Sequence, residues 1–319
     1  MGTRKEIFFK IIAIILSSIV TLIALEYYYT WYNNKWLNRV RNRIQANQLE
    51  TRLSNDPVLI YELNPDHPLN NSHGFRDREF TPRPEPGTKR VAVIGDSITM
   101  GLGVELHESF PTVLNRMFAE ANENIELYNF GVTGYNTEQE FQVLTTRVIH
   151  YHPDFILWVY HPNDPAHAVL DNANGDLGKY YIRPSCHLCF AVNRFFYFKS
   201  RQNYILNHDL DHADRHEKWH FWKRDKIKSD LTQIRDWLSD QSLPWLMIII
   251  PVWPQPGHTF DPYYLIRSTE DKHLLLDELE IPYVDLFEFF RTREPIQYQV
   301  GVDRWHPNAL GHAAIAEYI

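Results

Sequence analysis

The sequence contains little cysteine and no excess of positive charge. Only two cysteines occur in 319 residues, Cys186 and Cys189, so a zinc site made of four cysteines of this chain is excluded. The two residues form a local disulfide, remain free thiols, or serve a redox or metal-binding role. The formal net charge of −8 argues against nucleic acid as the main partner, because phosphate binding needs a basic surface. Internal repeats and low-complexity tracts are also absent.

The N-terminus differs from the rest of the chain in its hydrophobicity. Residues 7–25 carry a single charge, Lys10, and the aromatic residues Tyr27, Tyr28, Tyr29 and Trp31 follow them. This length and composition predict a membrane-spanning helix with aromatic side chains at the interface. A cleaved signal peptide and a buried core helix are the alternatives. We expect an uncleaved membrane anchor over residues 1–31.

The remaining chain has the composition of a globular protein, with 44% hydrophobic and 14% aromatic residues. Residues 32–88 are expected to form a juxtamembrane stalk and an extended lead-in. From residue 89 onward, short apolar runs alternate with segments of helical periodicity; these runs are "RVAVIG", "IELYNF", "FILWVY", "WLMIII" and "YVDLF". Such alternation predicts an α/β domain over residues 89–319, with a central parallel five-stranded sheet. An insertion covers about residues 161–223 and is a candidate lid. The alternative for its aromatic run, residues 195–198, is packing against the core.

Polar motifs follow several of these strands. Gly95 ends the first run and precedes Asp96 and Ser97, and further motifs carry Gly134, Asn163, and Asp303 with His306. Because the carboxyl ends of parallel strands share one edge of a sheet, these residues are expected to converge on one crevice. Taken singly, each residue also has a structural interpretation: Ser97 as a helix N-cap, Gly134 and Asn163 as turn residues, Asp303 as a cap of the final helix.

Taken together, the residues fit nucleophilic catalysis by serine. Such catalysis needs a base beside the hydroxyl, a group that orients this base, and donors for the developing oxyanion. We assign Ser97 as the nucleophile, His306 as the base and Asp303 as the orienting carboxylate. The Gly134 amide and the Asn163 side chain are candidate oxyanion donors.

These motifs resemble the SGNH hydrolases, also called GDSL-like esterases and lipases. The matching residues are Gly95, Asp96 and Ser97 in "VIGDSITMGLGV", Gly134 in "NFGVTGYNT", Asn163 in "HPND", and Asp303 and His306 in "DRWHPNALGHAAIAEYI". The similarity covers roughly residues 71–319. In one departure, His161 stands where the family commonly has glycine. The resemblance implies a flavodoxin-like three-layer α/β/α sandwich and an oxyanion hole formed by the Ser97 amide, the Gly134 amide and Asn163.

The resemblance also implies an enzyme that needs no metal or organic cofactor. The leading hypothesis is a membrane-anchored esterase, with its catalytic domain on the extracytoplasmic side, acting on an O-acylated glycan, a lipid or a small ester. An O-acyltransferase for a cell-surface polysaccharide is the first alternative, because the same residues serve both reactions. An inactive scaffold of the same fold is the second. A ladder of His208, His212, His216 and His220 favours a solvated helix face over a metal site.

Overall fold

The computed structural model describes residues 2–45, 50–162, 164–166, 186–208, 215–254, 257–261, 263, 265–301, 303 and 305–319. Its strands are β1 (Thr51–Leu53), β2 (Tyr61–Leu63), β3 (Lys89–Ile94), β4 (Ile125–Asn129), β5 (Phe155–Tyr160), β6 (Trp245–Ile249) and β7 (Tyr283–Asp285). Its helices are α1 (Gly2–Gln45), α2 (Ser97–Met100), α3 (Phe110–Glu120), α4 (Thr137–Thr146), α6 (His187–Asn207), α7 (Arg215–Trp222), α8 (Arg224–Asp240), α9 (Ile266–Glu278), α10 (Phe287–Arg291) and α11 (Ala309–Tyr318). Short 3-10 helices cover Leu106–Glu108, Val148–Tyr151 and Pro295–Gln297.

The centre of the fold is a five-stranded sheet in the order β4-β3-β5-β6-β7. All neighbouring strands in it are parallel, and Ile94 at the end of β3 pairs with Trp158 of β5. The central strands are apolar on both faces because helices cover each side. The predicted α/β sandwich with a parallel five-stranded sheet is therefore confirmed.

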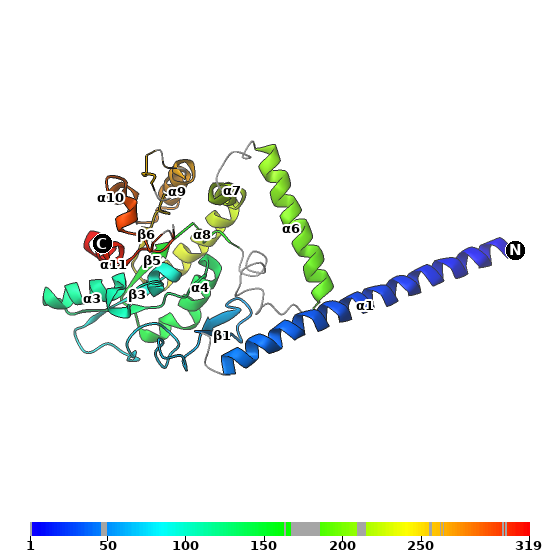
Figure 1. The fold of residues 1–319 in the computed structure, drawn as a ribbon, viewed down its shortest axis with the longest axis horizontal. Coiled ribbons are helices and arrows are strands. Elements are labelled where there is room, and N and C mark those ends of the chain that lie inside the picture. Colours follow the sequence, from blue (N-terminus) through cyan, green and yellow to red (C-terminus); the bar gives the residue numbers. More distant parts are fainter. Residues whose placement is uncertain are drawn as a thin grey trace.

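Each face of the sheet packs against its own set of helices (Figure 1). On one face, Ala92 and Ile94 of β3 join a core cluster with residues of α4 and α8, and α9 extends this layer. On the other face, Val93 joins a cluster with residues of α3, α10 and α11. The alternation of neighbouring side chains along β3 thus supplies both layers of the core.

The helical spacing of the segment expected to be a stalk agrees with the structure, whereas the strands of the lead-in were not predicted. Helix α1 continues as far as Gln45, and β1 and β2 then form an antiparallel pair. Tyr61 of β2 is buried and lies with its ring centroid 5.3 Å from that of Tyr135. The lead-in is therefore packed against the loop that follows β4, and the division at residue 88 stays a prediction.

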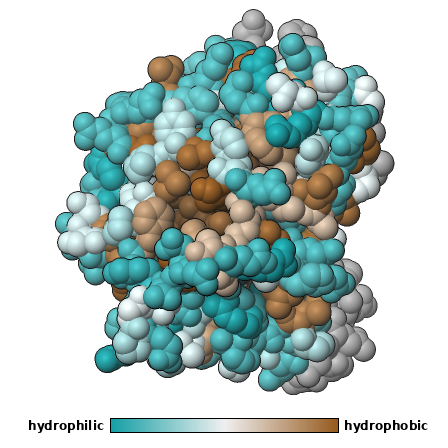
Figure 2. Space-filling model, turned by 90° about the vertical axis from the view of Figure 1, so that its left-hand side faces the viewer, coloured by the Kyte–Doolittle hydropathy of each residue, from teal (hydrophilic) through white to brown (hydrophobic). Residues whose placement is uncertain are grey.

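One apolar hollow opens at the amino ends of the strands. The cavity measures about 470 Å³ and is lined by residues of β3, α3, β4, β5 and β6, and by Ile319. Figure 2 shows the face of the molecule on which α3 and the last residue lie, with apolar side chains around a hollow. This hollow is at the opposite edge of the sheet from Ser97, which follows the carboxyl end of β3.

Candidate active site

Ser97 is the first residue of α2, and Gly95 and Asp96 separate it from the end of β3. Its side chain does not cap the helix, because the Asp96 carboxylate takes that role and accepts a hydrogen bond from the Ile98 amide at 2.9 Å. The N-cap interpretation of Ser97 is therefore wrong. The hydroxyl remains available, and Ser97 as a whole is 8% exposed.

His306 and Asp303 come from the loop before α11 and complete a chain of hydrogen bonds with Ser97. The His306 Nε2 atom lies 2.9 Å from the Ser97 hydroxyl, and its Nδ1 lies 2.6 Å from the Asp303 carboxylate. The alternative role of Asp303 as a helix cap is wrong, since Asn308 caps α11 through the Gly311 amide. This arrangement suits a serine hydroxyl that donates to Nε2 and a ring that donates from Nδ1 to Asp303.

Asp303 is held in its charged form. Burial raises the pKa of its carboxyl, but hydrogen bonds from the His306 ring and the Trp305 amide lower this pKa by more. The pKa of Asp303 therefore lies below its ordinary value. An ionised Asp303 stabilises a protonated His306 ring.

The candidate oxyanion donors are described in part. Gly134 has φ of +72°, a left-handed conformation that favours glycine, and an added Cβ would lie 2.9 Å from the Tyr61 hydroxyl. Its loop starts beside the nucleophile, where the Val132 amide donates to the Gly95 carbonyl at 3.1 Å. Asn163 lies outside the described residues. His161, at the departure from the family pattern, donates its amide to Asp164 at 2.9 Å and has its ring edge-on to Trp305.

Two supporting residues escaped the sequence interpretation. Asn129, at the end of β4, donates from its side chain to the Thr99 carbonyl at 2.7 Å and accepts from the Gly131 amide. It thereby joins the helix of Ser97 to the loop of Gly134. Tyr61 donates its hydroxyl to the Thr133 carbonyl at 2.8 Å. The position of Asn129 at the carboxyl end of a strand offered a sequence signal, whereas Tyr61 precedes the predicted domain and offered none.

Asp96, which precedes Ser97, belongs to a group of buried carboxyls that also includes Glu140 and Asp164. Burial, together with the charges of Asp164 and Asp96, raises the pKa of Glu140. Burial and the charge of Asp96 raise the pKa of Asp164. Protonated carboxyls relieve the repulsion between these groups, and Glu140 also accepts a hydrogen bond from the Trp158 indole at 2.8 Å.

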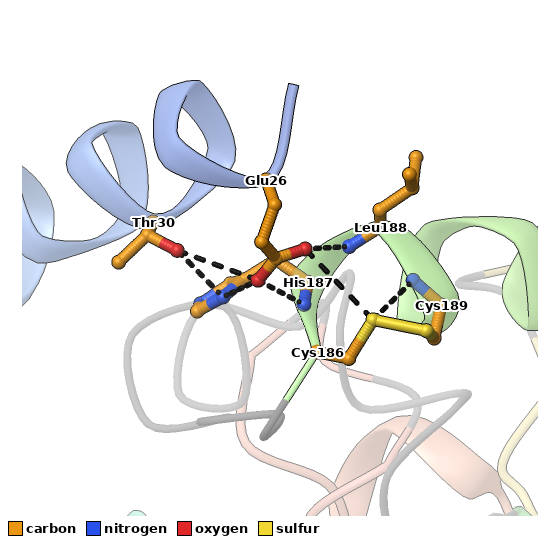
Figure 3. The surroundings of a disulfide bond; sticks show 6 residues. All are labelled: Glu26, Thr30, Cys186, His187, Leu188 and Cys189. Carbon is orange, nitrogen blue, oxygen red and sulfur yellow. Dashed lines mark hydrogen bonds and ion pairs between the residues drawn. A yellow bond between two sulfur atoms is a disulfide. The ribbon is translucent and has the colours of Figure 1, made fainter. Parts of the chain in front are cut away.

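The cysteine and histidine candidates have partners other than Ser97, Asp303 and His306. Cys186 and Cys189 form a disulfide at the start of α6 (Figure 3). Of the histidine ladder, His212 lies outside the described residues, while His220 is buried and bonded to Asp271 at 2.8 Å. Across the described part of the chain, no group of three or more histidine, cysteine or acidic side chains is placed to hold a metal ion.

Helix α1 has the length and hydropathy of a membrane span over Glu6–Tyr32, with a mean hydropathy of 2.6 in its most apolar window. None of that window is buried against the rest of the protein. A signal sequence near the N-terminus has the same length and composition.

Comparison with known proteins identifies the family. The sequence model of the GDSL-like lipase/acylhydrolase family matches residues 93–314, more than half of the chain, while no curated protein matches. Similar solved structures include the acetyl xylan esterase AlAXEase, with 13% identity over 72% of this chain and 96% of that chain, and a TM-score of 0.44. The lipase Lip_vut3 from goat rumen metagenome has 18% identity, coverages of 72% and 95%, and a TM-score of 0.47.

The family match includes Ser97, Gly134 and Asp303 with His306. This match agrees with the resemblance found in the motifs. It shows that the chain is an enzyme of ester chemistry, in general an acyl ester hydrolase or acyltransferase. The chain belongs to the GDSL-like lipase/acylhydrolase family.

Proposed function

We propose that the protein is a serine esterase that forms an acyl-enzyme on Ser97. The observation that carries this proposal is the unbroken chain of hydrogen bonds from Asp303 through His306 to Ser97. Ser97 and His306, which this chain joins, are 209 residues apart in sequence. A capping serine or a surface histidine has no need of such an arrangement.

In the first step, the Ser97 hydroxyl attacks the ester carbonyl while His306 takes its proton at Nε2. Asp303 orients the ring through Nδ1 and stabilises its positive charge. The amides of Ser97 and Gly134 and the side chain of Asn163 donate hydrogen bonds to the oxyanion, as the family resemblance implies. His306 then protonates the leaving alcohol, and the acyl group stays on Ser97.

In the second step, His306 takes a proton from water, which attacks the acyl-enzyme. Collapse of the second tetrahedral intermediate releases the carboxylic acid and returns the proton to Ser97. The residues of the chain suffice for this scheme, which uses no metal or organic cofactor.

The substrate class in this proposal is an O-acylated glycan, a lipid or a small ester near a membrane. Two features support a location outside the cytoplasm with α1 as an uncleaved anchor. The span of α1 is long enough to cross a bilayer, and the disulfide between Cys186 and Cys189 is of a kind that persists in oxidising compartments.

The first test is hydrolysis of a short-chain chromogenic acetate ester by the full chain in detergent. We expect Ser97→Ala to lose about 1000-fold or more of the turnover, while Ser229→Ala, on the exposed side of α8, keeps it. Equal turnover in the wild type and Ser97→Ala would overturn the proposal. Product that forms only when a sugar acceptor is added would assign acyl transfer instead, and no reaction in either assay would assign a scaffold.

A further inference from the structure

Helix α6 stands apart from the sheet and joins α1 to α7 (Figure 1). Its N-terminus is fastened to α1 by Glu26, whose carboxylate accepts hydrogen bonds from the amides of His187 at 2.8 Å and Leu188 at 2.7 Å. The His187 ring also lies 3.1 Å from the Thr30 hydroxyl (Figure 3). The start of α6 is thus held at one defined level along α1.

That level is the end of the apolar part of α1. Glu26 is the first charged residue after Lys10, and the aromatic residues Tyr28, Trp31 and Tyr32 that follow are exposed. Aromatic side chains of this kind are enriched where a membrane helix meets water. If α1 crosses a membrane as proposed above, α6 therefore begins at the membrane surface.

The direction of α6 fits this surface. In Figure 1, α6 runs across α1 and not along it, so a bilayer crossed by α1 would lie alongside α6. The sheet and α7 lie on one side of α6, and the apolar part of α1 extends away on the other side. One face of α6 is therefore turned toward the sheet and α7, and the opposite face is turned toward the bilayer that α1 would cross.

The two faces differ in their contacts. The inward face packs against α7: the ring centroids of Tyr197 and Trp222 are 4.8 Å apart, and Arg201 lies over the Trp222 ring. The outward face carries Val192, Phe195, Phe196 and Leu206, which follow the helical period. Phe195 is 62% exposed and Phe196 59%. Large apolar side chains exposed together on one helix face mark a surface that binds a protein or a membrane.

We propose that this outward face of α6 lies in the headgroup region of the phospholipid bilayer that α1 spans. The phenyl rings enter the boundary between headgroups and acyl chains, and Lys199, exposed on the same face, extends its ammonium group to lipid phosphates. With contacts at both α1 and α6, the enzyme is held in one orientation on the membrane instead of swinging on a single helix. The inference rests on the proposed membrane anchor but not on the chemistry at Ser97.

The test measures the environment of nitroxide labels on the full chain in vesicles of phosphatidylcholine and phosphatidylglycerol. Single cysteines are introduced as Phe195→Cys and Phe196→Cys on α6, Leu274→Cys on α9 and Ile15→Cys on α1. The disulfide leaves Cys186 and Cys189 unlabelled in the absence of reductant. Leu274 is the matched control, as an exposed apolar residue on a helix away from α1. Collision with oxygen, which concentrates in lipid, is compared with collision with a water-soluble nickel chelate.

We expect the labels at residues 195, 196 and 15 to collide more with oxygen and less with nickel, by several-fold relative to the label at residue 274. Labels at 195 and 196 that match the one at 274 would overturn the proposal while a lipid-exposed label at 15 leaves the anchor standing. Labels at 195 and 196 shielded from both reagents would show a protein partner or a second copy and would also overturn it. A water-exposed label at 15 would overturn the anchor and the inference together.

Discussion

At the scale of single residues, the candidate site depends on a division of roles between neighbouring polar residues: one caps a helix and the other is free for the proposed chemistry. Asp96 satisfies the start of α2, so the Ser97 hydroxyl is left to His306. Asn308 satisfies the start of α11, so Asp303 is left to orient the ring. Short polar residues are thus paired within each motif, one for the backbone and one for the proposed chemistry.

The role of Asp303 is tested by Asp303→Asn. The amide keeps the size of the side chain but loses the negative charge that stabilises the protonated ring. It can also present an N–H donor to His306 Nδ1 and so favour the wrong tautomer, and we expect turnover to fall by about 10⁴-fold. The measurement is kcat for a short acetate ester across pH 6–9. Unchanged kcat would show that Asp303 has no part in orienting the base.

The conformation of Gly134 gives a second prediction. A methyl group at this position would lie 2.9 Å from the Tyr61 hydroxyl, and the left-handed backbone conformation disfavours alanine. Gly134→Ala is therefore expected to displace the proposed oxyanion amide. Loss of one such donor costs about 100-fold to 1000-fold in turnover. The control is Tyr61→Phe, which removes the obstructing hydroxyl: the alanine should cost less in that background than alone. Equal costs in both backgrounds would contradict the steric explanation.

At the scale of elements, the buried His312 links α11 to α3. Its Nδ1 accepts a hydrogen bond from the Phe110 amide at 3.1 Å, which requires a neutral ring. Burial, followed by the positive charges of His306 and Arg76, lowers the pKa of His312 to about 3 from 6.5. The unfolded chain therefore binds the proton more readily than the folded protein, and acid weakens this contact between the helices.

The corresponding prediction concerns stability and pH. Stability from a neutral His312 is complete above pH 6.5 and is lost as the pH falls toward 3, because only the unfolded state gains the proton in that range. Between pH 7.5 and 4.5 we expect it to account for a loss of about 2 to 3 kcal/mol in the free energy of unfolding. His312→Asn retains an acceptor for the Phe110 amide and does not titrate. Urea denaturation of both proteins at each pH should show a smaller loss in the variant, and an identical loss would contradict the assignment.

At the scale of the whole molecule, one parallel sheet brings the distant motifs together at its carboxyl edge, while α1 and α6 extend away from it (Figure 1). The disulfide lies where these two helices meet, next to Glu26 (Figure 3). The state of this disulfide in cells reports on the side of the membrane at which the domain resides.

With the domain outside the cytoplasm, we expect Cys186 and Cys189 to be oxidised in cells. They are the only two cysteines of the chain, so a mass-tagged alkylating reagent should add nothing to the denatured protein before reduction and two tags after it. Two tags without reductant would place the domain in a reducing compartment and contradict the proposed topology. The intact mass from the same experiment reports whether residues 1–31 are retained.

The sequence by itself determined the features that depend on near neighbours in the chain. The apolar runs predicted the strands, their alternation with helices predicted a parallel sheet, and the motifs of Ser97 and His306 pointed to the family, all of which the structure and the family match confirm. The roles of Ser97, Gly134, Asn163, Asp303 and His306 stay predictions.

Only the tertiary structure decided the features that depend on contacts between distant segments. It showed that Asp96 caps α2, that Tyr61 supports the loop of Gly134, and that the outward face of α6 exposes large apolar side chains while its start is tied to α1. The physical reason is that periodicity and motif spacing report local conformation, whereas a cap, a buried hydroxyl or an exposed helix face is selected by packing across the whole fold.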